Sequence, residues 1–241
     1  MDVASKRNSI GGGALGVPLR FRIWMLPLSL FPLAHLSALV FIAVAHLPVW
    51  ERIAGVLGTL LVLPPLLARL AHALAPPSGG RIAVESGGFL AWWATTQFQL
   101  LFNRIPMIEE ILRIFPGLYS FWLRLWGSRI GALTFWAPGV SVIDREYLDL
   151  GDNVVFGAGV RLNGHVILRN QLGRVELAVA PIKIGSGALV GGYCLLTAGT
   201  EIAPGEFTRA HLLSPPFTVW RDGKRFRSDN ADSPDERDAN I

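Results

Sequence analysis

The stretch IKIGSGALVGGYCLLTAGTEIA, residues 182 to 203, carries an apolar residue at every sixth position. The same step occurs in two earlier groups of the chain. The positions are Ile130 and Trp136, then Leu150, Phe156 and Leu162, then Ile184, Val190, Leu196 and Ile202. A fixed short period of this kind is typical of a solenoid, in which each repeat stacks on the one before it.

Two further positions of the hexad support a coiled chain. Glycine often follows the apolar residue, as at Gly151 and Gly185, and permits a tight corner. The fifth position is small or β-branched, at Thr134, Val140, Val154, Val160, Val166, Ala188, Cys194 and Thr200. We therefore predict one short strand and one corner per six residues, with three strands to each turn of a parallel β-coil. The lone cysteine, Cys194, is then a core spacer.

The count fails once in the second half of the chain. Leu162 and Ile184 are 22 residues apart, which is not a multiple of six, so part of this stretch must leave the coil. Residues 169–176 are the predicted excursion, and loops that stand off a rigid scaffold often carry function. His165 lies just before it, as the fourth residue of a hexad, where we expect an outward-facing corner and no core contact.

The hexads, together with SFWLRLWGSRIG (residues 120–131) and APIKIGSGALVGG (residues 180–192), resemble the hexapeptide-repeat acyltransferases. The resemblance covers about residues 122–217 and implies an all-β left-handed parallel β-helix of about four coils. It is closer to membrane-tethered members that carry hydrophobic helices before the β-helix. In this family a histidine before an extruded loop and a P-I-x-I-G strand is the catalytic base, which His165 and residues 181–185 match. Since γ-class carbonic anhydrases and nucleotidyltransferase tails share the coil, the hexads specify fold more strongly than chemistry.

Further residues are candidates for the site around His165. Many relatives carry an acidic residue soon after the histidine, but this chain reads HVIL, so Asp144, Glu146 or Glu176 would have to orient His165, with Asp144 preferred. Asn163 and Glu146 are the candidate substrate-binding residues. The candidate acyl-CoA-binding residues are Gly191, Gly192, Lys183, Lys224 and Arg225, with the two glycines as possible oxyanion donors and Lys224 and Arg225 near the phosphates.

The N-terminal part is apolar. The chain has 241 residues, 51% of them hydrophobic and 17% charged, with a mean hydropathy of +0.41. Residues 23–50 contain no charge, and a second run extends from residue 53 to about residue 75, so we predict a helical hairpin with its turn near residues 48–52. It either spans the membrane or is re-entrant. Basic residues before the first helix place the N-terminus, and hence the β-helix, on the cytoplasmic side.

The predicted organisation has five parts. These are a basic tail (1–22), the hairpin (23–76), an amphipathic connector (77–126), the β-helix (127–217) and a polar tail (218–241). The tryptophan-rich connector either lies at the membrane interface or packs on the β-helix, and Gly127 ends its last helix. The net charge of +4 is spread along the chain, so we expect no nucleic-acid partner. His165 and His211 are too few for a zinc site of the carbonic anhydrase kind, and we expect no metal.

These observations and the resemblance lead to one functional expectation and its alternatives. We expect a membrane-anchored, acyl-CoA-dependent O-acyltransferase, with acetyl the favoured group. It would modify a glycan or lipid-linked sugar as a homotrimer in a bacterial inner membrane. The alternatives are an N-acyltransferase acting on an amino sugar, and a catalytically silent β-helix that scaffolds a membrane complex.

Overall fold

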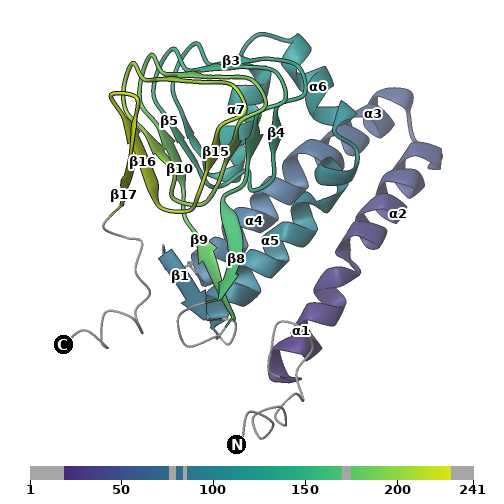
Figure 1. Cartoon of the computed structure of the whole chain (residues 1–241). Coiled ribbons are helices and arrows are strands. Elements are labelled where there is room, and N and C mark those ends of the chain that lie inside the picture. Colours follow the sequence, from purple (N-terminus) through teal and green to yellow (C-terminus); the bar gives the residue numbers. More distant parts are fainter. Residues whose placement is uncertain (1–18, 76–79, 84–85, 170–174, 229–241) are drawn as a thin grey trace, which may run out of the picture.

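The computed structural model describes residues 19–75, 80–83, 86–169 and 175–228, and it contains a helical layer beside a triangular β-coil (Figure 1). The helices are α1 (Leu19–Ser29), α2 (Phe31–Val44), α3 (Val49–Leu57), the π-helical η1 (Gly58–Val62), α4 (Leu63–Leu74), α5 (Gly87–Arg104), α6 (Met107–Ile114) and α7 (Leu118–Trp126). The coil follows α7 directly.

The coil has three faces, and the strands within each face run parallel, as the hexads predict. The first face contains β2 (Arg129–Ile130), β5 (Leu148–Leu150), β10 (Ile182–Ile184), β13 (Glu201–Ile202) and β16 (Thr218–Arg221). The second contains β3 (Phe135–Trp136), β6 (Val155–Phe156), β11 (Leu189–Val190) and β14 (Phe207–Thr208). The third contains β4 (Ser141–Val142), β7 (Arg161–Leu162), β12 (Leu195–Leu196) and β15 (Leu213–Ser214). The described chain thus makes four turns and one further strand.

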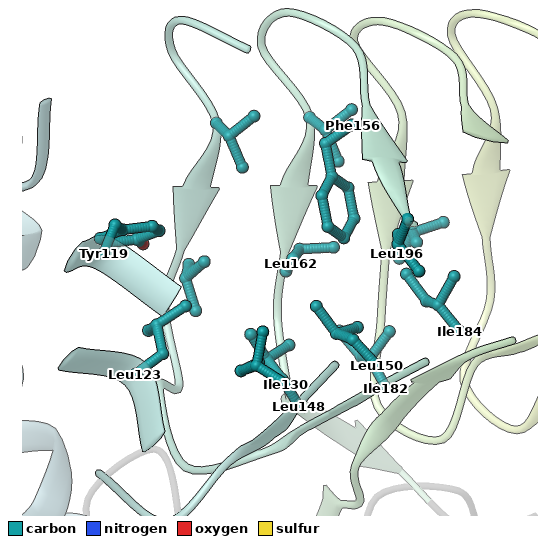
Figure 2. Close-up of a cluster of buried hydrophobic side chains, with 14 of the residues drawn as sticks. Tyr119, Leu123, Ile130, Leu148, Leu150, Phe156, Leu162, Ile182, Ile184 and Leu196 are labelled. Carbon is teal, nitrogen blue, oxygen red and sulfur yellow. The ribbon is translucent and has the colours of Figure 1, made fainter. Parts of the chain in front are cut away.

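The predicted apolar positions fill the interior of the coil. Phe156, Leu162 and Leu196 are completely buried, and Figure 2 shows them pointing into the prism beside Leu150 and Ile184. Cys194 is also buried, so its predicted role as a core spacer is confirmed. Burial of these side chains is the main favourable term for a coil whose strands are only two or three residues long.

The coil continues past the last apolar position of the count. Thr208, Ser214 and Trp220 take the next three inward positions, and the Ser214 hydroxyl accepts hydrogen bonds from Thr200 Oγ1 and Trp220 Nε1, both 2.9 Å away. Thr208 and Ser214 are polar, so the apolar count stops at Ile202, although the predicted β-helix extends to residue 217. The predicted tail boundary at residue 218 is therefore wrong, because β16 belongs to the coil and pairs antiparallel with β17 (Lys224–Arg227).

The count has two irregularities, and both lie at the corner between the third and first faces. The smaller one separates Val142 and Leu150, which are eight residues apart instead of six. Leu162 and Ile184 occupy successive inward positions 22 residues apart against a regular six, so 16 residues leave the coil. They include β8 (His165–Arg169) and β9 (Val175–Val179), which pair antiparallel with each other. The other edge of β9 pairs antiparallel with β1 (Gly80–Ala83), a strand from the connector. We call β1, β9 and β8 the extruded sheet. Val166 lies in this sheet, so its assignment to a coil position is wrong.

The two apolar runs form helices, and the chain turns between them earlier than predicted. Phe21–Val44 and Val49–Leu74 are two helices long and apolar enough to cross a membrane. The chain turns at residues 45–48, because Pro48 lies just before α3 and the predicted turn residue Arg52 lies within it. Inside the hairpin, His35 Nε2 lies 2.9 Å from the Thr59 carbonyl oxygen in η1, so His35 joins the two helices.

The connector packs on the coil. Trp92, Trp122 and Trp126 are at least 96% buried, and α5 and α7 lie between the hairpin and the coil (Figure 1). These tryptophans are therefore not interfacial anchors. Gly127 ends α7 in the left-handed region at φ 111°, as predicted.

The completely buried Leu162 tests the packing of the coil. We predict that Leu162→Ala lowers the free energy of unfolding by about 2–5 kcal/mol, because it leaves a cavity between tightly stacked strands. Its exposed neighbour on β7 provides the control, since Arg161→Ala changes that energy by no more than about 0.5 kcal/mol. Chemical unfolding followed by circular dichroism measures both, and equal losses would contradict the inward direction of Leu162.

Candidate active site

The irregular corner brings His165 and Asp144 together. Nδ1 of His165 lies 2.8 Å and 2.7 Å from the two carboxylate oxygens of Asp144. A carboxylate can only accept, so Nδ1 carries the hydrogen and Nε2 keeps its lone pair when the ring is neutral. The pair therefore presents Nε2 as a proton acceptor.

The geometry follows from the two breaks in the count. β5 and β10 are neighbours in the first face, with Leu148 opposite Ile182, so the segments that precede them stack on one another. Residues 143–147 form the earlier segment, which we call the acidic corner, and it carries Asp144. Gly164 lies against this corner, where an added Cβ would come within 2.7 Å of the Tyr147 Cβ and 3.1 Å of the Asp144 Cβ. The close approach requires glycine directly before His165.

His165 does not face outward, contrary to the sequence prediction. Its side chain is 22% exposed, and its ring meets the edge of Trp92 on α5 at a centroid distance of 4.9 Å. The reason is that β8 starts an antiparallel sheet, so His165 shares a side of that sheet with its partner Val179 and not a corner of the coil. A helix of the same chain covers the histidine.

The surroundings of His165 favour its protonated form. Burial lowers the pKa of His165, but the hydrogen bond and the negative charge of Asp144, with a smaller effect of Glu146, raise it above the ordinary value of 6.5. The carboxylate thus increases the basicity of the ring.

Glu146 is held inside the same corner. Its side chain is 2% exposed, and its Oε2 accepts a hydrogen bond of 2.7 Å from Gln99 Nε2 on α5. Burial, followed by the charge of Asp144, raises the pKa of Glu146 well above its usual range. Glu176, the third carboxylate considered, lies 3.6 Å from Arg81 in the extruded sheet. Of the three, Asp144 is the one that the structure places on the His165 ring.

Arg145 locks the acidic corner to the helices and was not singled out by the sequence pattern. It is 1% exposed and donates to Gln99 Oε1 at 3.0 Å, to Asn103 Oδ1 at 2.9 Å, and from Nε to Glu109 Oε1 at 2.7 Å. The acceptors lie on α5 and α6. The only available signal was a run of three charged residues, Asp144 to Glu146, inside an otherwise apolar repeat.

The predicted site residues Asn163 and Lys183 lie in different parts of the coil. Asn163 is two residues before His165, and its buried Oδ1 has no hydrogen-bond partner among the described residues. Lys183 is on the outer side of the first face and pairs with Glu201 at 2.8 Å. Asn163 is thus part of the same corner, whereas Lys183 belongs to a surface ladder of charges.

Gly191 and Gly192 are not brought to His165. They follow β11, at the corner between the second and third faces. The N–H of Gly191 donates to the carbonyl and hydroxyl oxygens of Thr208, both 3.1 Å away, so it is used within the coil. An added Cβ on Gly191 would lie 2.6 Å from the Ala210 nitrogen, which explains the glycine structurally. Within one chain the two glycines therefore lie away from His165, and their role as oxyanion donors stays a prediction.

Lys224 and Arg225 are exposed on β17. Arg225 lines a cavity of about 370 Å³ with Arg81, Leu168, Pro215, Pro216, Phe217, Thr218, Phe226 and Arg227. In the extruded sheet Leu168 pairs with Glu176, and Arg81 pairs with Ala178. Side chains alternate along a strand, so these residues point to the side of the sheet opposite to that of His165 and Val179. The cavity therefore opens on the opposite side of the extruded sheet from His165.

The described residues contain no group of three or more His, Cys, Asp or Glu side chains placed to hold a metal ion. His211 is exposed, and its ring stacks on Tyr193 at a centroid distance of 5.2 Å. It lies at the same corner as Gly191 and contributes nothing to the His165–Asp144 pair.

No protein-family model matches the sequence, and no functionally curated protein matches it. Among solved structures, the chain is similar to a hexapeptide-repeat acetyltransferase from Vibrio cholerae, with 14% identity over 54% of this chain and 91% of that chain and a TM-score of 0.32. It is also similar to a maltose O-acetyltransferase from Clostridium difficile 630 (15% identity, 54% and 88% coverage, TM-score 0.29). A galactoside acetyltransferase in complex with coenzyme A is a third such structure (14% identity, 52% and 81% coverage, TM-score 0.32).

All three of these structures are acetyltransferases. Likeness at this level of identity and TM-score transfers no residue, substrate or assembly to this chain. The chemistry of the site therefore has to be argued from the geometry of the acidic corner.

The His165–Asp144 pair predicts a shifted titration. We expect the His165 ring to titrate above pH 6.5, because its cationic form is stabilised by the carboxylate. Asp144→Asn removes both the charge and the hydrogen-bond acceptor for the cation, so the midpoint moves to lower pH. Nuclear magnetic resonance of labelled imidazole nitrogens measures both, and an unmoved midpoint in Asp144→Asn would refute the pairing.

Proposed function

We propose that this chain is a membrane-anchored acyl-CoA-dependent O-acyltransferase, with acetyl the favoured group and a glycan or lipid-linked sugar the acceptor. The observation that carries the proposal is the bond from His165 Nδ1 to Asp144, which leaves Nε2 as a general base. The three-faced coil and the acetyltransferase neighbours support the same class of reaction.

In the proposed reaction, Nε2 of His165 accepts the proton of the acceptor hydroxyl as its oxygen attacks the thioester carbonyl carbon. A C–O bond forms, and the tetrahedral intermediate collapses with cleavage of the C–S bond. The imidazolium then returns its proton to the thiolate, so the base is regenerated. Asp144 stabilises the imidazolium and fixes the ring, which suits general base catalysis worth about 10² to 10⁴ in rate.

Several residues are proposed to contact the substrates. The unpartnered Oδ1 of Asn163 would accept a hydrogen bond from the acceptor beside His165. Lys224 and Arg225 would bind the phosphates of acyl-CoA, with Arg225 in the arginine-lined cavity. Glu146 is buried against Gln99, so a direct substrate contact is not proposed for it.

The hairpin is proposed to anchor the chain in the membrane with the coil on the cytoplasmic side, where acyl-CoA is available. Large apolar side chains such as Leu33, Phe41 and Trp50 are 64–72% exposed on the hairpin, which suits contact with lipid. A homotrimer is also proposed. The second face carries an outward apolar row, Phe135, Val155, Leu189 and Phe207 in register, which supports lateral packing of coils.

The catalytic proposal is tested at His165. We predict that His165→Gln loses on the order of 10² or more of acyl transfer while keeping its thermal stability, because glutamine fills the space beside Trp92 without a basic nitrogen. His211→Ala is the matched control, since it removes a histidine at a distant corner and retains transfer. Assays on membranes or purified protein decide, and wild-type transfer in His165→Gln would refute the mechanism.

Binding of the acyl donor separates the enzyme from the scaffold alternative. We predict that acetyl-CoA raises the melting temperature of the purified protein, because a ligand at 100 times its Kd stabilises the folded state by about 2.7 kcal/mol. Arg225→Ala should reduce this shift if its guanidinium binds a phosphate. The absence of any shift at millimolar acetyl-CoA would favour a catalytically silent scaffold.

A further inference from the structure

His72, in the last turn of the second apolar helix, reaches the acidic corner. Its Nε2 lies 4.0 Å from Glu146 Oε1, and the side chains are 22% and 2% exposed. Its ring also lies against the Tyr147 ring at a centroid distance of 5.7 Å. The hairpin therefore contacts the coil beside the His165–Asp144 pair.

His72 Nε2 and Glu146 Oε1 are each other's nearest candidate hydrogen-bond partner. Neither His72 Nε2 nor Glu146 Oε1 has a hydrogen-bond partner among the described residues, and both are buried. Buried polar atoms are rarely left unpaired. A separation of 4.0 Å exceeds a hydrogen bond but is closed by a small ring movement or a single bridging water. Because Gln99 holds the other carboxylate oxygen, Glu146 is positioned between α4 and α5.

Only one residue, Arg145, separates Glu146 from Asp144 in the acidic corner. Arg145, between them, is fixed to α5 and α6 by its buried hydrogen bonds. Tyr147, which follows, is 7% exposed in an apolar cluster with Trp92 and Val179. Gln99 donates to Glu146 and also accepts a hydrogen bond of 2.8 Å from the backbone N–H of Arg145, so a movement of Glu146 reaches the backbone beside Asp144 through Gln99.

We propose that His72 is a positioning residue, which holds Glu146 and thereby fixes the corner that orients Asp144 on His165. This inference rests on the proposed function, because it gives the apolar hairpin a part in setting the base as well as in anchoring. Mispositioning by a fraction of an ångström at a proton-transfer centre lowers turnover more than substrate binding.

The charged and titratable groups around Glu146 make the coupling measurable. Asp144, Arg145, Tyr147 and His165 lie near it on the coil and the extruded sheet, and His72 lies near it on α4. The negative charge of Glu146 raises the pKa of His165. Without the His72 ring, the buried carboxylate of Glu146 has lost its facing donor and ionises less readily, so the pKa of His165 falls.

The experiment compares His72→Ala, His72→Gln, Glu146→Gln and the double variant His72→Ala/Glu146→Gln, with His46→Ala as control. His46 is an exposed histidine next to the hairpin turn. Each protein is purified in detergent, its His165 ring is titrated by nuclear magnetic resonance, and kcat and KM for acyl transfer are measured. Melting temperatures report on folding.

We expect His72→Ala to lower the His165 midpoint and to reduce kcat about tenfold with little change in KM. His72→Gln restores most of both, because its amide supplies a donor. Glu146→Gln lowers the midpoint by itself, and adding His72→Ala then changes little. His46→Ala matches wild type.

A merely structural His72 gives a different pattern. A lower melting temperature with an unmoved His165 midpoint, or fully additive effects in the double variant, would overturn the proposal. If His72→Ala does not fold, a His72→Gln protein with an altered kcat and an unmoved midpoint has the same consequence. The titration needs no substrate, so absence of acyl transfer in the wild type would refute the proposed function without deciding the role of His72.

Discussion

The buried ion pair between Arg145 and Glu109 ties the two halves of the molecule together. Arg145 lies at the acidic corner of the coil and Glu109 on α6, and they are 1% and 3% exposed. The guanidinium also lies within 6 Å of the ring centres of Phe102, Trp122 and Trp126. Removing one partner from such a pair typically costs about 3–5 kcal/mol, because the other charge stays buried and unpaired. The coil and the helices are therefore one structural unit.

This constraint explains why the candidate site lies where the hexads fail. In the regular turns each two-residue strand points one side chain inward and the other outward, and neighbouring strands only stack these rows in register. At the corner between the third and first faces, extra residues leave the coil and meet the helical layer. Asp144 is followed directly by Arg145, which is bound to α5 and α6, so the backbone that carries Asp144 is fixed. The ring of His165 lies between Asp144 and Trp92.

The proposed anchor and the proposed base are adjacent in this arrangement. The second apolar helix ends at Leu74, two residues beyond His72, which is the side chain through which it meets Glu146. Phe21 and Met25 of α1 pack on the apolar cluster that contains Trp92 and Tyr147. A hairpin with these contacts contributes to the shape of the site, in contrast to a tether that could be exchanged for any membrane segment.

The sequence by itself predicted the coil and the two apolar helices, and it marked one histidine as a candidate base. Short-range periods and uncharged runs are local properties of a sequence. The strands from Leu150 to Leu162 and from Ile184 to Ile202 could therefore be assigned to the coil without knowledge of tertiary contacts. The apolar count stopped at Ile202 because Thr208 and Ser214 are inward but polar, and their hydrogen-bond partners are visible only when the turns stack. Strand β16, directly after the predicted end of the coil at residue 217, was therefore missed.

Only the tertiary structure decided the direction of His165 and the surroundings of Asp144. The sequence placed His165 at an outward corner, because it could not show that the excursion folds back as an antiparallel sheet against α5. Gln99, Asn103, Glu109 and His72 come from three helices and carry no pattern that points to residues 143–147. Long-range contacts of buried polar groups depend on how the chain closes on itself, and a linear period contains no information about that closure.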